Sequence, residues 1–233
     1  MNAMHPLLDI GVAAARAAAR VIQEAAQSPA ALEIRQKQPN DFVTQVDLAS
    51  EKIIVATLLN ACPGHAVRSE ESIHAHGTPG ADHVWIVDPL DGTSNFIHGY
   101  PAYAVSIALS IRGRIEHGVV LDAVNGDVFH ASLGTGAWRN GERLHVATRP
   151  GLEGALLGTS CPYRPGPAFA PSMAMLSQVM LRVAGIRRSG CAALDLAWTA
   201  AGRTDGCFDL GLNAWDVAAG SLLVTEAGGQ VGN

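Results

Sequence analysis

Two carboxylates separated by two residues follow an apolar run in the middle of the chain. Residues 85–96 read Trp-Ile-Val-Asp-Pro-Leu-Asp-Gly-Thr-Ser-Asn-Phe, so a buried strand should end at Asp88 and a helix should begin soon after Asp91. Carboxylates bind hard cations such as Mg²⁺, and the free N–H groups of a helix start bind anions. The segment therefore predicts a site for a phosphate ester bridged by magnesium.

Further acidic positions bring carboxylates to the ends of other predicted elements. Glu70 lies in a Ser-Glu-Glu-Ser loop, Asp216 opens a predicted helix, and Asp47 stands where a helix N-cap belongs. Taken singly, such positions are typical of solvated loops and N-caps. Taken together they supply enough oxygen ligands for two magnesium ions. The predicted ligands are Glu70, Asp88, the Leu90 carbonyl, Asp91 and Asp216.

Histidines and cysteines give no comparable pattern. Histidines at positions 65, 74, 76 and 83 fit no metal-ligand spacing, which favours ordinary loop histidines. Cysteines at positions 62, 161, 191 and 207 form no Cys-x-x-Cys pair, which predicts reduced thiols. Charged residues interrupt the first twenty positions, and no run of about 18 apolar residues occurs. We therefore expect a cytoplasmic protein with neither signal peptide nor membrane span.

Composition limits the classes of protein to which the chain can belong. Its 233 residues are 48% hydrophobic and 16% charged, which predicts a folded core in one large domain or two small ones. The net charge of −5 argues against nonspecific nucleic-acid binding over the whole surface. Arg187-Arg188 is the one dense basic pair.

The periodicity of apolar residues changes along the chain. Helices are predicted over residues 5–27 and from Asp47 through residue 59, with a strand over 84–87. Alternating residues from 102 to 146, with turns at Asn125-Gly126 and Asn140-Gly141, predict an antiparallel meander. Beyond it, strands near 155–159 and 205–210 alternate with helices near 172–183, 191–201 and 215–227. We expect an N-terminal α+β half (1–148) and a C-terminal α/β half (149–233).

Several of these segments resemble the inositol monophosphatase family, and in particular the bacterial inositol-1-monophosphatases with their extragenic-suppressor subtype. Residues 85–98 resemble the family's first signature, and residues 215–229 resemble its second. Residues 41–47, 70–72 and 190–196 match the blocks between them in the same order. The resemblance covers nearly the whole chain. It implies a layered α-β-α-β-α sandwich, with an antiparallel N-terminal sheet and a mixed C-terminal α/β half, in a homodimer.

The resemblance also implies roles for single residues. Glu70, Asp88, Leu90, Asp91 and Asp216 would hold two or three magnesium ions. Thr93, with Asp47 behind it and Glu70 nearby, would orient and deprotonate the attacking water, and the backbone of Gly92 and Thr93 would bind phosphate. Lithium inhibition is implied as well. The predicted substrate contacts are Asp91, Gly92, Thr93, Gly190, Cys191, Ala192, Asp209 and Asp216.

This chain departs from the family's pattern at several positions. Asp209 replaces the usual Glu and is one methylene shorter, so its contact with a ring hydroxyl would need a bridging water. Cys191 replaces a Ser or Thr and is a weak donor, and Ser69 replaces a frequent Gly. Family members usually continue past residue 233 with a strand and a helix, so we expect an open strand edge in the C-terminal half.

The expected function is magnesium-dependent hydrolysis of inositol 1-phosphate or a similar small polyol phosphate. Histidinol phosphate, fructose 1,6-bisphosphate and a nucleotide 3′-phosphate are alternative substrates, and Asp209 with the 160–170 loop would decide among them. A haloacid-dehalogenase-like phosphatase is disfavoured because that motif needs an Asp two residues after Asp88, where Leu90 stands. A role as a partner of the transcription or ribosome machinery, through Arg187-Arg188, remains a further alternative.

Overall fold

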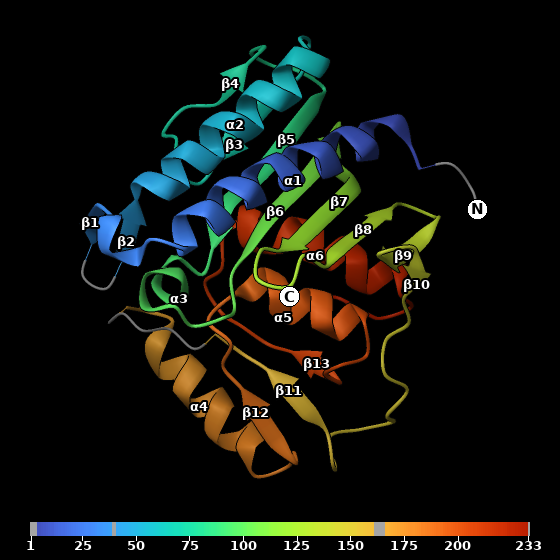
Figure 1. Cartoon of the computed structure of the whole chain (residues 1–233). Coiled ribbons are helices and arrows are strands. Elements are labelled where there is room, and N and C mark those ends of the chain that lie inside the picture. Colours follow the sequence, from blue (N-terminus) through green and yellow to red (C-terminus); the bar gives the residue numbers. More distant parts are fainter. Residues whose placement is uncertain (1–3, 39–40, 161–165, 233) are drawn as a thin grey trace.

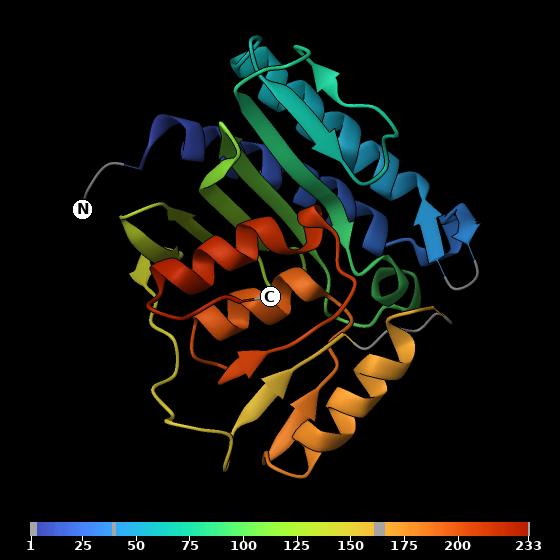
Figure 2. The ribbon, with the colours of Figure 1, turned by 180° about the vertical axis from the view of Figure 1, so that it is seen from behind.

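Helices and sheets of the chain alternate in five layers (Figure 1). The computed structural model describes residues 4–38, 41–160 and 166–232. Helices α1 (Pro6–Ala26) and α2 (Gln45–Ala61) cover one face of an eight-stranded sheet, and α5 (Ala192–Ala200) and α6 (Ala214–Glu226) cover the other (Figure 2). A three-stranded sheet and the outer helix α4 (Phe169–Met180) follow. This order confirms the predicted layered sandwich.

The large sheet has the strand order β10-β9-β8-β7-β6-β5-β3-β4. Strands β6 to β10 form the predicted antiparallel meander. The sheet is antiparallel as expected except at one place, where β3 pairs with β5 in parallel. The strands are β3 (Ala66–Ser69), β4 (His76–Gly77), β5 (His83–Asp91), β6 (Ala104–Ile111), β7 (Arg114–Asp122), β8 (Val128–Ser132), β9 (Gly136–Arg139) and β10 (Glu142–Arg143).

The small sheet consists of β12 (Gly185–Arg187), β11 (Leu156–Gly158) and β13 (Gly206–Cys207). Both outer strands run parallel to β11 in the described residues, as the predicted alternation of helix and strand favours. The reason is the connections, since α4 and α5 each return the chain to the edge from which the next strand starts. The strand expected over 205–210 shortens to two residues.

The shorter elements lie around the end of β5. Strands β1 (Ile34–Gln38) and β2 (Asp41–Thr44) form an antiparallel hairpin before α2, after the single turn η1 (Pro29–Ala31). Helix α3 (Thr93–His98) follows β5. These pieces, with the start of α6, surround the segment that the sequence singled out.

Two apolar clusters fill the spaces on either side of the large sheet. Leu8, Ile22, Trp85 and Ile107 belong to the cluster beneath α1 and α2. Phe129, Leu194 and Leu223 belong to the cluster beneath α5 and α6. The C-terminal helices thus pack directly on the N-terminal sheet. The division near residue 148 falls between β10 and β11 and stays a prediction.

A search of the described helices finds none that is long and apolar enough to cross a membrane.

Candidate active site

Strand β5 carries Asp88 and Asp91 through a bulge. The sequence predicted that the strand ends at Asp88. Instead the strand continues to Asp91, because its pairing with β6 resumes there after a register shift. Asp88 is 1% exposed, and its Oδ1 accepts a hydrogen bond from the Leu90 N–H at 3.0 Å. Ser50 of α2 donates to the Pro89 carbonyl at 2.7 Å. The bulge is therefore fixed from both sides.

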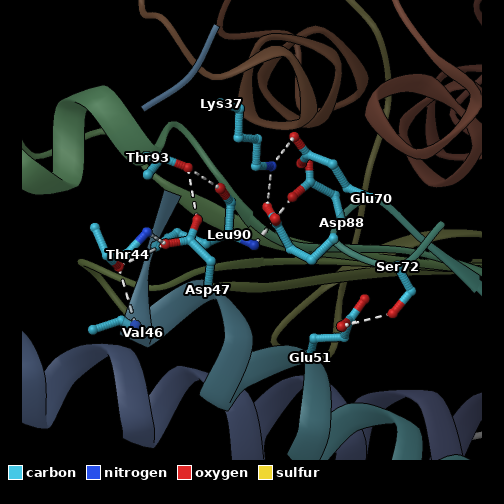
Figure 3. Close-up of polar contacts among 11 residues, drawn as sticks. Lys37, Thr44, Val46, Asp47, Glu51, Glu70, Ser72, Asp88, Leu90 and Thr93 are labelled. Atoms are coloured by element: carbon cyan, nitrogen blue, oxygen red, sulfur yellow. Dashed lines mark hydrogen bonds and ion pairs between the residues drawn. The ribbon is translucent and has the colours of Figure 1, made fainter. Parts of the chain in front are cut away.

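The parallel pairing of β3 with β5 brings Glu70 to the same sheet edge. Ser69 pairs with Val87, and the Glu70 N–H donates to the Val87 carbonyl at 3.1 Å. The next residues along the two strands, Glu70 and Asp88, therefore lie side by side (Figure 3). Parallel strands end at the same edge, which is why an unpredicted parallel pair matters for the site.

Lys37 of β1 also reaches this group of carboxylates. Its Nζ lies 3.4 Å from Glu70 Oε1 and 2.6 Å from Glu71 Oε1 (Figure 3). Sequence reasoning missed Lys37, since a single lysine in a polar hairpin gives no local signal. Its charge partly offsets the charges of the two glutamates, although burial still raises the pKa of Glu71 to about 7.

Asp47 holds the hydroxyl of Thr93. Thr93 Oγ1 lies 2.8 Å from Asp47 Oδ1 and 3.1 Å from the Leu90 carbonyl, while Asp47 Oδ2 accepts from the N–H and the hydroxyl of Thr44 (Figure 3). The prediction of Asp47 as N-cap is wrong. Thr44 is the N-cap of α2, and Asp47 is the third helical residue of a capping box. This position lets Asp47 turn its second oxygen towards Thr93.

Asp216 is the third helical residue of α6, as Asp47 is of α2. Asn213 is the N-cap, and the Asn213 N–H donates to Asp216 Oδ2 at 2.6 Å in a second capping box. Ser106 of β6 donates to the Trp215 carbonyl at 3.1 Å, which fixes the start of α6 beside the end of β5. Burial, and after it the charge of Glu70, raises the pKa of Asp216 to about 6.

The acidic side chains raise one another's pKa. Burial and then the charge of Glu70 raise the pKa of Asp88 well above its usual range. Burial raises the pKa of Asp91 to about 7, with the charge of Asp216 adding to it and the Ala193 N–H opposing it. Burial also raises the pKa of Glu70. A nearby cation would relieve this repulsion.

The donor chemistry of these residues fits a hard divalent cation. All the predicted ligands offer oxygen, which Mg²⁺ prefers. Within the described ranges, no three or more His, Cys, Asp or Glu side chains are already arranged to hold a metal ion.

The predicted substrate turn contacts Asp91. Asp91 Oδ2 accepts from the Ala193 N–H at 2.7 Å and from Cys191 Sγ at 3.2 Å. Gly190 has φ +79° and Gly92 has φ +93°, and both conformations favour glycine. The turn thus joins Gly190, Cys191 and Ala192 to the carboxylate of β5.

Asp209 is held by the residues that follow β11. Its Oδ1 accepts from both the N–H and the hydroxyl of Ser160, each at 2.5 Å. Its charge contributes to the raised pKa of Asp216, so the two carboxylates belong to one region. Cys161 and the residues after it up to position 165, which belong to the loop expected to select the substrate, lie outside the described residues.

A hydrogen-bonded group supports the loop that carries Glu70. Ser72 donates to Glu51 Oε2 at 3.0 Å and lies 2.8 Å from His76 Nε2. Nearby, His65 accepts from the Trp85 indole N–H at 3.1 Å and stacks on His83. Cys62, Cys191 and Cys207 are free thiols. These histidine contacts are packing and hydrogen-bonding contacts within the protein.

A cavity of about 590 Å³ opens beside Glu70. Its wall combines the charged groups of the site with apolar side chains from β2, α2 and the loop after β3. The lining residues are Lys37, Val43, Leu48, Arg68, Ser69, Glu70, Glu71, Ser72, Ile73, Ala75 and Trp215. Glu70 and Glu71 are thus the acidic residues that this cavity reaches.

Comparisons with known proteins agree with this arrangement. The model of the inositol monophosphatase family matches residues 3–233. The Nus factor SuhB of Pseudomonas aeruginosa is 48% identical over 231 residues, which are 98% of this chain and 85% of that protein.

Two solved structures have the same fold. The extragenic suppressor protein suhB of Bartonella henselae superimposes with a TM-score of 0.92 at 42% identity, over 96% of this chain and 86% of that one. An inositol monophosphatase from Anabaena superimposes with a TM-score of 0.82 at 36% identity, over 95% and 81% respectively.

Proposed function

Because the chain belongs to the inositol monophosphatase family, we propose that it is a magnesium-dependent phosphomonoesterase acting on inositol 1-phosphate or a similar small polyol phosphate. The observation that carries the proposal is the convergence of Glu70, Asp88, Asp91 and Asp216 next to the Asp47–Thr93 hydrogen bond. Buried carboxylates that raise one another's pKa need a positively charged partner. Magnesium ions would supply that charge, and a phosphate ester bound to them would be the reactant.

Each residue has a proposed part in the reaction. Two or three magnesium ions, held by Glu70, Asp88, Asp91, Asp216 and the Leu90 carbonyl, would offset the charge of the phosphoryl group and activate water. Glu70 and Thr93 orient the attacking water. Asp47 keeps the Thr93 hydroxyl in place and favours loss of a proton from the water through it. The backbone N–H groups of Gly92 and Thr93 bind phosphate oxygens.

The alcohol part of the substrate would contact the other side of the site. Asp91, Asp209, Asp216 and the turn at residues 190–192 would receive its hydroxyl groups. Among the described residues, Ser160 and Thr159 donate to Asp209 Oδ1, and Oδ2 would receive a hydroxyl of the substrate. Histidinol phosphate, fructose 1,6-bisphosphate and nucleotide 3′-phosphates are the alternative substrates for the same chemistry.

The test is phosphate release from inositol 1-phosphate across a magnesium titration, with chelator and with lithium as separate additions. Histidinol phosphate and fructose 1,6-bisphosphate run in parallel. We expect magnesium-dependent, lithium-sensitive release, fastest with inositol 1-phosphate. In the Asp88→Asn variant the rate should fall by at least about a hundredfold, since a charged ligand in the centre of the site is lost. Full turnover by Asp88→Asn would refute the proposed site.

The names of the relatives favour a second function in the same molecule. The curated relatives are called Nus factors, so we also propose a protein partner in the transcription machinery. Arg187 is the preferred contact, because it is exposed and, within the described part of the chain, its guanidinium donates to the neighbouring Ile186 carbonyl. Arg188 is less suitable as a probe, since it donates to the Ser160 carbonyl beside Asp209.

Co-purification of RNA polymerase with the tagged chain tests this second function. We expect polymerase with the wild-type chain and its loss with Arg187→Ala, while phosphatase activity stays the same. The absence of polymerase from the wild-type sample would count against the partner. We further propose that the protein is cytoplasmic and forms a homodimer. Light scattering of the purified chain measures its oligomeric state directly.

A further inference from the structure

We propose that Asn95 is a positioning residue that joins the metal-binding segment to the turn receiving the substrate alcohol, and thereby determines affinity for polyol phosphates. This inference rests on the proposed function and deepens it. It concerns a residue that lies in the conspicuous 85–96 segment but has no role in the mechanism above.

The side-chain amide of Asn95 connects two distant parts of the chain. Its Nδ2 donates to the Ala102 carbonyl at 2.6 Å and to the Ser189 carbonyl at 2.8 Å. Both N–H bonds are therefore used, and both acceptors are backbone oxygens. Ala102 leads into β6, whereas Ser189 lies 94 residues after Asn95, directly before the substrate turn.

The far end of that turn is fixed by the same segment. Ser189 is buried, and its Oγ accepts from the Cys191 N–H at 3.1 Å. Ala193 N–H and Cys191 Sγ then donate to Asp91 Oδ2. Asn95 and Asp91, four residues apart, thus hold the two ends of the turn. The proposed alcohol-binding atoms lie between these two attachments.

The backbone of the turn packs closely on the Asn95 side chain at Gly190. A Cβ added at Gly190 would lie 3.0 Å from Asn95 Nδ2, and the φ of +79° already favours glycine. The turn could not approach the amide this closely with a larger residue. An amide is also the side chain of this size that offers two N–H donors, whereas a carboxylate would direct oxygen at two carbonyls.

Variants of Asn95 should therefore affect the hydrolysis of a polyol phosphate and of p-nitrophenyl phosphate differently. A polyol phosphate uses both the metal-binding segment and the turn, whereas p-nitrophenyl phosphate has no hydroxyls for the turn. Losing the contact to Ser189 should raise KM for inositol 1-phosphate about tenfold, which corresponds to about 1.4 kcal/mol for the lost hydrogen bond. The kcat/KM for p-nitrophenyl phosphate should stay within about twofold.

The experiment compares Asn95→Asp and Asn95→Ala with Ser94→Ala, an exposed neighbour on α3 that serves as the matched control. Steady-state kinetics with both phosphates, at saturating magnesium, give the two parameters for each variant. Gly190→Ala disturbs the same contact from the other side and should also raise KM for inositol 1-phosphate. Equal losses on both substrates would overturn the inference, because Asn95 would then act through the fold or the metal centre.

Hydrogen exchange of the free protein provides a readout that needs no activity. Amides of residues 189–195 should exchange faster in Asn95→Ala than in Ser94→Ala, with the rest of the chain unchanged. Unchanged exchange in that segment would overturn the inference even if the enzyme works as proposed. If the wild-type chain hydrolyses neither phosphate, the proposed function fails, and the exchange result still decides whether Asn95 holds the turn.

Discussion

Asp47 is buried beneath Thr93, and both of its carboxylate oxygens accept hydrogen bonds from protein groups. Burial raises its pKa, and the hydrogen bonds from Thr44 and Thr93 oppose that rise. At the scale of single residues, Asp47 is thus a fixed acceptor that sets the direction of one hydroxyl. Thr93 can transmit this effect to the substrate side because its oxygen keeps lone pairs that can accept a hydrogen bond.

Replacing Asp47 by Asn tests this role. The amide keeps the size of the side chain but presents an N–H to at least one threonine donor, so the Thr93 hydroxyl should lose its orientation. We expect kcat to fall about a hundredfold with little change in KM, as for the loss of a group assisting proton transfer. Steady-state assays measure both, and Asp9→Asn, an exposed acid on α1, is the control. A kcat equal to that of the control would contradict the role.

At the scale of elements, the site depends on how closely α6 approaches the large sheet. A Cβ added at Gly118 of β7 would lie 3.0 Å from the Ala219 carbonyl oxygen and 3.1 Å from Ala219 Cα. These are backbone atoms of α6, so they cannot move aside as a flexible side chain can. The absence of a side chain at Gly118 therefore determines how closely α6, which carries Asp216, packs on β7.

The Gly118→Ala variant should therefore shift α6 and weaken the fold. Overpacking of this kind costs about 1–3 kcal/mol. The magnesium concentration for half-maximal activity should rise as well, because Asp216 moves with the helix. Gly64→Ala is the matched control, since a Cβ there meets nothing within 4 Å. Denaturant unfolding and a magnesium titration measure the two effects, and identical results for both variants would show that α6 tolerates the methyl group.

The whole molecule contains a pH-sensitive contact far from the carboxylates. His117 of β7 is 6% exposed, bonds to Ser132 Oγ at 2.7 Å and stacks on His5 at the start of α1 with ring centroids 4.4 Å apart. Burial, and then the charge of His5, lower the pKa of His117 to about 4. The folded state therefore favours the neutral imidazole.

The sign of the pH effect follows from this depressed pKa. The unfolded chain takes up a proton at His117 near pH 6.5, whereas the folded chain does so only near pH 4. The stabilisation is complete above pH 6.5 and is lost as the pH falls towards 4, by about 2–3 kcal/mol. The buried carboxylates change stability in the opposite direction, so the measurement is the difference between wild type and His117→Gln across this range. A constant difference would contradict the prediction, and exposed His74→Gln is the control.

The sequence alone determined the parts of the site that lie within a few residues of one another. Asp88, Asp91, Gly92 and Thr93 follow from one apolar run and the turn residues after it, because strand ends and helix starts are read from local spacing. The order of helices and strands followed from the same periodicities, whereas the layered sandwich followed from the resemblance to the family.

The tertiary structure decided the contacts between residues far apart in the chain. The parallel pairing that places Glu70 beside Asp88, the reach of Lys37 to Glu70, and the bond from Asn95 to Ser189 leave no local pattern. Local spacing also misplaced Asp47, since a capping box looks like an N-cap when only the acid is noticed. Such contacts arise when packed layers bring strand ends together, and their partners are set by the fold rather than by neighbours in sequence.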